Sequence, residues 1–224
     1  MGFNVAIDGP AGAGKSTIAK LVAKKMNFIY VDTGAMYRAI ALYLLRNGIK
    51  TEEKDRFATE CRGADVTIRY EDGVQQVLLN GENVSGLIRT EEVGNMASAS
   101  SVDGAVRAKL LDLQRNLAKE NDVVMDGRDI GTNILPNADV KFYLTASVEE
   151  RANRRFKELT EKGQECDFEK IKADIIERDE RDMNREIAPL KQAEDAILVD
   201  SSDMSIDEVL DFMVQAIKTR SAGK

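Results

Sequence analysis

Five short apolar runs recur along the chain, separated by longer stretches in which apolar residues follow a helical spacing. The runs cover residues 3–7, 28–31, 123–125, 140–144 and 196–199. Each is too short for a helix and is rich in β-branched or aromatic residues, which predicts buried strands. Aspartate directly follows four of them, at Asp8, Asp32, Asp126 and Asp200. Wholly apolar strands are typical of a parallel sheet that is covered on both faces.

Apolar residues at helical spacing predict helices between and after these strands. The helices are expected at residues 16–26, 35–46, 105–119, 148–160, 168–185 and 206–218. Gly48 is placed to end the second helix, and Ser205 is placed to cap the last one. Strands that alternate with helices indicate βαβ units, and therefore an α/β fold with a five-stranded parallel sheet flanked by helices.

One segment breaks this pattern because its apolar residues alternate with period two. Residues 65–70 and 74–79 are predicted strands joined by the turn at 71–73, and Asn80-Gly81 is a strong hairpin signal. Residues 62 to about 90 are therefore expected to form a small antiparallel β insertion.

The first predicted strand leads into a glycine-rich loop. Residues 9–17 match G-x-x-x-x-G-K-[ST] at every specified position, between a predicted strand and a predicted helix. Glycines let the backbone wrap a phosphate, and successive amides at a helix N-terminus supply positive partial charge. We expect Lys15 to reach the β- and γ-phosphates of ATP and Ser16 to bind Mg²⁺. The predicted ATP-binding residues are Gly9, Pro10, Ala11, Gly12, Ala13, Gly14, Lys15, Ser16 and Thr17.

The composition narrows the possible chemistry. The 224 residues include no histidine, which excludes catalytic triads and metal sites that depend on it. The formal net charge of −7 argues against nucleic-acid polymers and anionic membranes as partners. Cys61 and Cys166 are far apart in the sequence, and neither a signal peptide nor a membrane-spanning run is evident. We therefore expect a monomeric, cytoplasmic protein with two free thiols.

Charged residues lie just after the predicted strand ends, where open α/β sheets bind their ligands. Arg38 is one helical turn beyond the second strand, in position to face a second anion. Asp126, Arg128 and Asp129 follow the third strand, and Asp126 is placed to hold Mg²⁺ through a water molecule. The chain has no N-K-x-D run, which argues against a GTPase.

Arginines are dense toward the C-terminus and follow helical spacing. One predicted helix carries Arg151, Arg154 and Arg155 on one face, and the next carries Arg178, Arg181, Asp182 and Arg185. Because acidic residues are equally dense between 151 and 191, one interpretation is a solvated, charge-paired helix pair. The other is a helical lid at about 150–170, whose arginines clamp the transferred phosphoryl group and which excludes water.

Four segments in this order resemble bacterial cytidylate kinases. They are the loop at 9–17, Asp32-Thr-Gly-Ala-Met-Tyr-Arg38, Asp126-Gly-Arg-Asp-Ile-Gly-Thr132 and Glu177-Arg-Asp-Glu-Arg-Asp-Met-Asn-Arg185. The insertion at 62–90 is also similar to the extra nucleotide-binding subdomain of the bacterial members. The resemblance implies a three-layer P-loop fold, with a single kinase domain over 1–224 that includes this subdomain and the lid.

The resemblance also implies a reaction and roles for individual residues. The γ-phosphoryl group of ATP would pass to CMP or dCMP with Mg²⁺ as cofactor, and small nucleotides would be the partners. Lys15, Arg128, Arg151 and Arg155 would be catalytic, while Ser16 and, through water, Asp126 would hold the metal. The acceptor phosphate would meet Arg38, Arg128 and Arg185; the cytosine Thr33, Ser98, Arg107 and Asp129; and the ribose Arg178 and Asp182.

Two alternatives stay open from the sequence alone. A P-loop kinase of another small acceptor would show no CMP-dependent thermal shift. A regulatory module that binds ATP without phosphoryl transfer would expose an apolar partner surface. The number of arginines on the acceptor side argues against the regulatory module.

Overall fold

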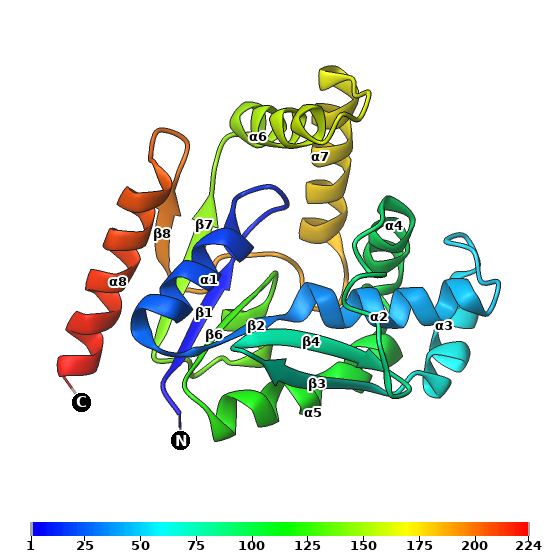
Figure 1. The fold of residues 1–224 in the computed structure, drawn as a ribbon, viewed down its shortest axis with the longest axis horizontal. Coiled ribbons are helices and arrows are strands. Elements are labelled where there is room, and N and C mark those ends of the chain that lie inside the picture. Colours follow the sequence, from blue (N-terminus) through cyan, green and yellow to red (C-terminus); the bar gives the residue numbers. More distant parts are fainter. Residues whose placement is uncertain (1, 224) are drawn as a thin grey trace. The chain divides into compact units, whose positions relative to one another are not determined.

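The computed structural model describes residues 2–223, which divide into two compact units. Unit 1 comprises Gly2 and Ile29–Val123, and unit 2 comprises Phe3–Phe28 and residues 124–223. Within these residues a five-stranded sheet has the order β2 (Ile29–Asp32), β6 (Val123–Gly127), β1 (Asn4–Asp8), β7 (Val140–Thr145) and β8 (Ile197–Asp200) (Figure 1). The α/β class and the five-stranded parallel sheet flanked by helices are confirmed.

The strands differ from the prediction at their ends. β1 and β7 are parallel with Asp8 opposite Tyr143, and β7 is parallel to β8 with Thr145 opposite Asp200. Each strand ends one or two residues later than the apolar run does. At β1 and β8 this is because the aspartate after the run still pairs with the neighbouring strand. The aspartates that follow the runs therefore lie inside the strand ends, where their side chains reach the adjoining loops.

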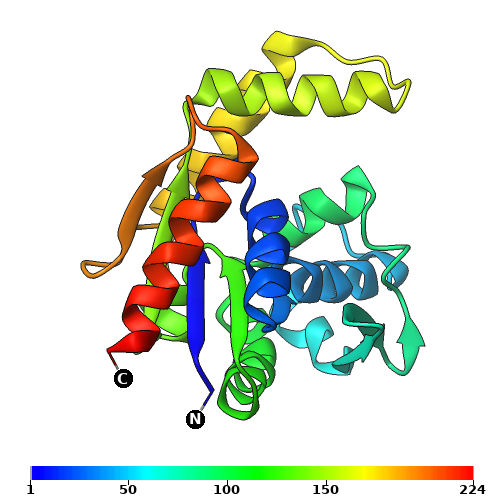
Figure 2. The ribbon, with the colours of Figure 1, turned by 60° about the vertical axis from the view of Figure 1, so that its left-hand side comes forward.

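Unit 2 carries its helices in two groups. α1 (Lys15–Met26) and α8 (Ile206–Ala222) pack against each other and along β1 and β7 (Figure 2). α6 (Val148–Glu161) and α7 (Phe168–Asn184) form a helical hairpin (Figure 1). A π-helical turn at Ile130–Ile134 follows β6. None of the helices within residues 2–223 is long and apolar enough to cross a membrane.

Unit 1 contains the predicted β insertion among helices. The helices are α2 (Thr33–Arg46), α3 (Lys54–Glu60), a 3₁₀ turn at Cys61–Gly63, α4 (Glu91–Ser100) and α5 (Gly104–Glu120). The antiparallel sheet has the order β3 (Val66–Glu71), β4 (Val74–Leu79) and β5 (Glu82–Asn83). The hairpin predicted at Asn80-Gly81 is confirmed, since Leu79 pairs with Glu82 across it.

Polar side chains set where the helices begin. Asp32 accepts a hydrogen bond from the Ala35 backbone N–H, so α2 starts at Thr33, two residues before the predicted start. Asp103 accepts from the backbone N–H groups of the first turn of α5 in the same way. The predicted cap at Ser205 is confirmed and forms a full capping box with Glu208.

Candidate active site

The glycine-rich loop joins β1 to α1 in unit 2 and depends on two glycines. Gly9 has a φ of 149°, and a Cβ there would lie 1.9 Å from the Leu144 carbonyl oxygen. Gly12 has a φ of 76°, and a Cβ there would press on the Cβ of Arg151 at 3.3 Å. Side chains at these positions would push the loop off the sheet and off α6. Glycine at these two positions therefore lets the loop lie this close to β7 and α6.

Lys15 is the first residue of α1 and is buried. Its ammonium group donates to the Pro10 carbonyl oxygen at 2.7 Å, so the side chain folds back along the loop. Burial, with the nearby guanidinium groups of Arg128 and Arg178, holds the pKa of Lys15 well below its ordinary value, although the Asp126 carboxylate opposes this. The cations of α1, α7 and the β6 end thus lie close to one another. Such a concentration of positive charge is suited to phosphate groups.

Ser16 and Asp126 meet beside this lysine. The Ser16 hydroxyl donates to Asp126 Oδ2 at 2.9 Å, although the two residues are 110 positions apart in the sequence. Mg²⁺ in nucleotide sites is usually held by one or two protein oxygens together with waters and substrate phosphates. The hydroxyl–carboxylate pair at the helix N-terminus offers two such oxygens, so these residues fit the expected ion.

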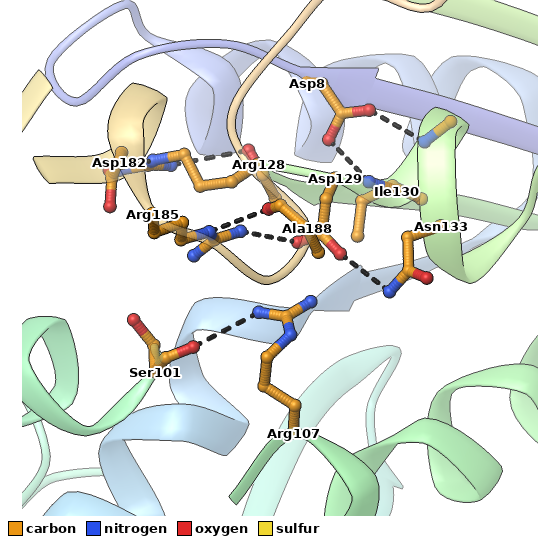
Figure 3. Close-up of polar contacts among 12 residues, drawn as sticks. Asp8, Ser101, Arg107, Arg128, Asp129, Ile130, Asn133, Asp182, Arg185 and Ala188 are labelled. Atoms are coloured by element: carbon orange, nitrogen blue, oxygen red, sulfur yellow. Dashed lines mark hydrogen bonds and ion pairs between the residues drawn. The ribbon is translucent and has the colours of Figure 1, made fainter. Parts of the chain in front are cut away.

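Two arginine–aspartate pairs connect the end of β6 to the C-terminal end of α7 (Figure 3). Arg128 Nε donates to Asp182 Oδ2 at 2.8 Å, and Arg185 Nη2 donates to Asp129 Oδ1 at 3.0 Å. Burial acts to raise the pKa of Asp182, but Arg128, Arg178 and Arg185 together outweigh burial and lower that pKa below its ordinary value. The structure therefore brings together four residues that were predicted to bind the acceptor nucleotide, namely Arg128, Asp129, Asp182 and Arg185.

The predicted lid arginines differ in how they are engaged. Arg151 is buried: its Nε donates to Ala146 O at 3.0 Å and its Nη1 to Ala11 O at 2.9 Å. Nη1 also forms an ion pair with Asp179 of α7 at 2.6 Å. Arg155, by contrast, is exposed and pairs with Glu158 on its own helix. Arg151 therefore links the glycine-rich loop to both α6 and α7, whereas Arg155 lies on the surface.

In unit 1 two of the predicted acceptor residues, Thr33 and Arg38, lie on α2. Thr33 is buried and begins α2. Arg38 lies further along α2, and its Nη1 donates to Ile88 O at 3.2 Å and Thr90 O at 3.4 Å. A Cβ at Gly94 would lie 3.0 Å from Arg38 Nη1, so glycine there leaves room for this guanidinium.

Arg107 is buried on α5 and has a fixed orientation. Its guanidinium lies 5.7 Å from the centroid of the Tyr37 ring, and its Nη1 donates to Ser101 O at 3.3 Å (Figure 3). The Ser101 hydroxyl in turn donates to the carbonyl oxygen of Ser98. Arg107 and Ser98, both predicted to surround the base, are thus joined through one residue.

Several residues with a structural part in the site were not predicted. Asp8 accepts hydrogen bonds from the backbone N–H groups of Ile130 and Gly131, both at 2.7 Å (Figure 3). Burial raises the pKa of Asp8 to about 6, although those two bonds act to lower it. The position of Asp8 directly after the apolar run at 3–7 could have indicated a role at the end of the strand. The ion-pair role of Asp179 had no signal, because acidic residues are dense throughout its helix.

Comparison with known proteins shows which family the chain belongs to. Residues 5–219 match the family model described as cytidylate kinase. The chain belongs to the cytidylate kinase family. It is 52% identical to a cytidylate kinase of Caldicellulosiruptor saccharolyticus, over 93% of this chain and 92% of that protein. It is 48% identical to a cytidylate kinase of Geobacter sp. strain M21, over 99% of this chain and 95% of the relative.

A solved structure supports the fold alone. The chain is similar to a shikimate kinase from Bacteroides thetaiotaomicron with a TM-score of 0.50 and 14% sequence identity. That match covers 96% of this chain and 98% of the other. The predicted three-layer P-loop fold is thereby confirmed.

Proposed function

We propose that this protein is a nucleoside monophosphate kinase that transfers the γ-phosphoryl group of ATP to CMP or dCMP, giving ADP and CDP or dCDP. The arrangement of charged side chains in unit 2 gives the most direct support. The Arg128–Asp182 and Arg185–Asp129 pairs lie in the same unit as Lys15, and Arg128 is close enough to lower the pKa of Lys15. Cations for an acceptor phosphate and for the ATP phosphates are thus neighbours, and family membership supports the same reaction.

The residue roles follow the chemistry of each group. Lys15 and the loop amides bind the ATP phosphates, and Arg128 spans the donor and acceptor sides. Arginine suits phosphate because its planar fork can donate two parallel hydrogen bonds, and aspartate suits the exocyclic amine of cytosine as an acceptor. We assign Arg38, Arg128 and Arg185 to the acceptor phosphate; Thr33, Ser98, Arg107 and Asp129 to the base; Arg178 and Asp182 to the ribose; and Arg151 and Arg155 to the lid.

The reaction requires no side chain as a base. An ionised oxygen of the CMP phosphate attacks the γ-phosphorus of ATP, a new P–O bond forms, and the bond to the β-phosphate oxygen breaks with ADP as the leaving group. Charge spreads over the three equatorial oxygens during transfer, and Lys15 and the arginines stabilise it there. The absence of histidine is therefore compatible with this chemistry.

We infer that Mg²⁺ accompanies ATP and that Ser16 and, through water, Asp126 hold it. The bound ion would neutralise charge on the β- and γ-phosphates. The Ser16–Asp126 hydrogen bond supports this, because it brings a hydroxyl and a carboxylate oxygen together beside the loop. We also propose a monomer that acts in the cytoplasm on small nucleotides rather than on nucleic-acid polymers. The two free thiols and the charge of −7 support that setting.

A coupled assay of ADP release tests the proposed acceptor. CMP, dCMP, UMP, AMP and GMP are each supplied with Mg²⁺ and ATP. We expect turnover with CMP and dCMP to exceed that with AMP and GMP by orders of magnitude. No turnover of either cytidine nucleotide would exclude the proposal.

A further inference from the structure

The outer edge of strand β2 is closed by side chains of the β insertion. Alternate residues of a strand direct their backbone groups to opposite edges. Ile29 donates its N–H to Asp122 O on one edge, so Tyr30 and Asp32 direct theirs to the other. There the Tyr70 hydroxyl of β3 donates to Tyr30 O at 3.0 Å. Side chains thus take the place of a neighbouring strand, since β2 is the first strand in the sheet order.

Gln75 of β4 completes this arrangement with a two-way amide contact. Its Oε1 accepts from the Asp32 backbone N–H at 2.9 Å, and its Nε2 donates to the Asp32 carbonyl oxygen at 3.2 Å. The carboxylate of Asp32 is engaged as well. Oδ1 accepts from the Ala35 N–H at 2.9 Å, and Oδ2 accepts from Arg89 Nη2 at 2.9 Å. Every polar group of this buried residue therefore has a partner, and Gln75 and Arg89 supply most of them.

The next residue in the chain is Thr33, which is assigned to the cytosine. Because Gln75 holds both backbone groups of Asp32, the peptide unit that joins Asp32 to Thr33 has little freedom to rotate. The segment that carries Arg89 also binds Arg38, through the carbonyl oxygens of Ile88 and Thr90 on either side of it. The insertion thus restrains a residue assigned to the base and one assigned to the acceptor phosphate.

We propose that Gln75 and Arg89 are positioning residues for the acceptor nucleotide, and that they set the preference for cytosine by fixing Thr33. They act through Asp32 rather than by touching substrate. This inference rests on the proposed function, since it needs Thr33 to contact the base. It also gives the insertion a definite role, because the small sheet at 66–83 closes the edge of β2 and fixes the start of α2.

Gln75→Met tests the proposal, since it keeps the side-chain length and removes both hydrogen bonds. We expect kcat/KM for CMP to fall about tenfold, mostly through KM, and the CMP-to-UMP ratio of kcat/KM to fall severalfold. KM for ATP should change less than twofold. Two ordinary hydrogen bonds have a net effect of this order.

Gln76→Met is the matched control, because Gln76 is the next residue on β4 and its side chain accepts a hydrogen bond from Asn83 of the same small sheet rather than binding Asp32. The control should keep the CMP-to-UMP ratio within twofold of wild type. Thermal unfolding of both variants shows whether they fold alike. Should Gln75→Met fail to fold, Arg89→Met tests the second partner of Asp32, and Arg89→Lys should restore part of the lost preference.

The outcomes separate the two proposals. Wild-type protein that does not phosphorylate CMP would overturn the proposed function, and this inference with it. Wild-type turnover of CMP with an unchanged CMP-to-UMP ratio in Gln75→Met and Arg89→Met would overturn only the positioning role. An equal loss with every acceptor, or a loss of ATP affinity, would likewise show general damage rather than positioning.

Discussion

Asp129 has both carboxylate oxygens bound by donors from the protein. Oδ1 accepts from Arg185 Nη2 and Oδ2 accepts from Asn133 Nδ2, each at 3.0 Å. At the scale of the single residue, the site therefore consists of charged groups already oriented by protein partners.

Asp129→Ala should mainly damage the use of CMP. We expect KM for CMP to rise about 10- to 100-fold, the range for loss of one good base contact, while KM for ATP stays within twofold. Initial rates measured against each substrate in turn check this. Asp112→Ala, which removes an exposed aspartate of α5, is the control. An unchanged dependence on CMP would show that Asp129 does not recognise the base.

Asp8 should give the protein a pH-dependent stability. Its pKa is raised by burial to about 6 in the folded state. The stabilisation is fully present below the unfolded pKa of 3.8 and is lost as the pH rises through about 6. Over that window the contribution of Asp8 to the free energy of unfolding should fall by about 3 kcal/mol.

Denaturant unfolding of the free protein from pH 4 to 7.5, compared with Asp8→Asn, measures this contribution. Asp8→Asn changes stability at every pH because one acceptor is lost, so the informative quantity is the slope with pH. Asp200→Asn at the exposed end of β8 is the control. Hydrogen bonds from Ser202 lower the pKa of Asp200, so its stabilisation is lost only as the pH falls below 3.8, and the control should not change the slope between pH 4 and 7.5. Parallel curves for wild type and Asp8→Asn would refute the expected shift.

At the scale of elements, the α6–α7 hairpin has its own small apolar core. Ala152, Ile171 and Ile175 are buried in it, and the rings of Phe156 and Phe168 meet edge to face at 6.0 Å. The buried Arg151–Asp179 pair adds a polar link between the same helices. The two helices are therefore packed against each other by apolar contacts as well as by charged pairs. Movement of this hairpin as a lid stays a prediction.

Asp179→Ala should loosen this hairpin. Removal of one partner leaves the buried guanidinium of Arg151 short of a counter-charge, which typically costs about 3–5 kcal/mol. In a chain of this size that corresponds to a melting temperature lower by about 10 °C. Thermal unfolding followed by circular dichroism tests it against Glu180→Ala, the exposed neighbour on the same helix. Equal melting temperatures for the two variants would contradict a stabilising role for the pair.

The sequence predicted elements well where local signals and packing agree. Strands with β-branched runs, the glycine-rich loop and the Ser205 cap were all found at their places. Helix α4 was missed because Gly94 and two serines weaken its helical propensity, and packing against α2 stabilises it instead. The burial of Arg151 was also missed, since spacing shows which residues share a helix face but not what that face packs against.

In the whole molecule, the net charge has to be considered together with where the charged residues lie. A net charge of −7 is compatible with anionic substrates, because cations are concentrated around Lys15 within unit 2. The part of the candidate site that could be predicted from the residues is the glycine-rich loop at 9–17, because its motif has a fixed spacing. The residues that support it, Asp8, Gln75 and Asp179, could not, because their roles depend on contacts between distant segments.

Transfer of the γ-phosphoryl group from ATP to CMP can be followed directly with a radioactive label. The protein is incubated with γ-³²P-labelled ATP, Mg²⁺ and CMP, the products are separated, and Lys15→Ala and the exposed Lys24→Ala serve as the paired variants. We predict that label appears as the β-phosphate of CDP, one per ADP formed, in wild type and Lys24→Ala, and that Lys15→Ala lowers the rate by about 10²- to 10³-fold. Label found only as inorganic phosphate, or retained in ATP, would contradict phosphoryl transfer to CMP.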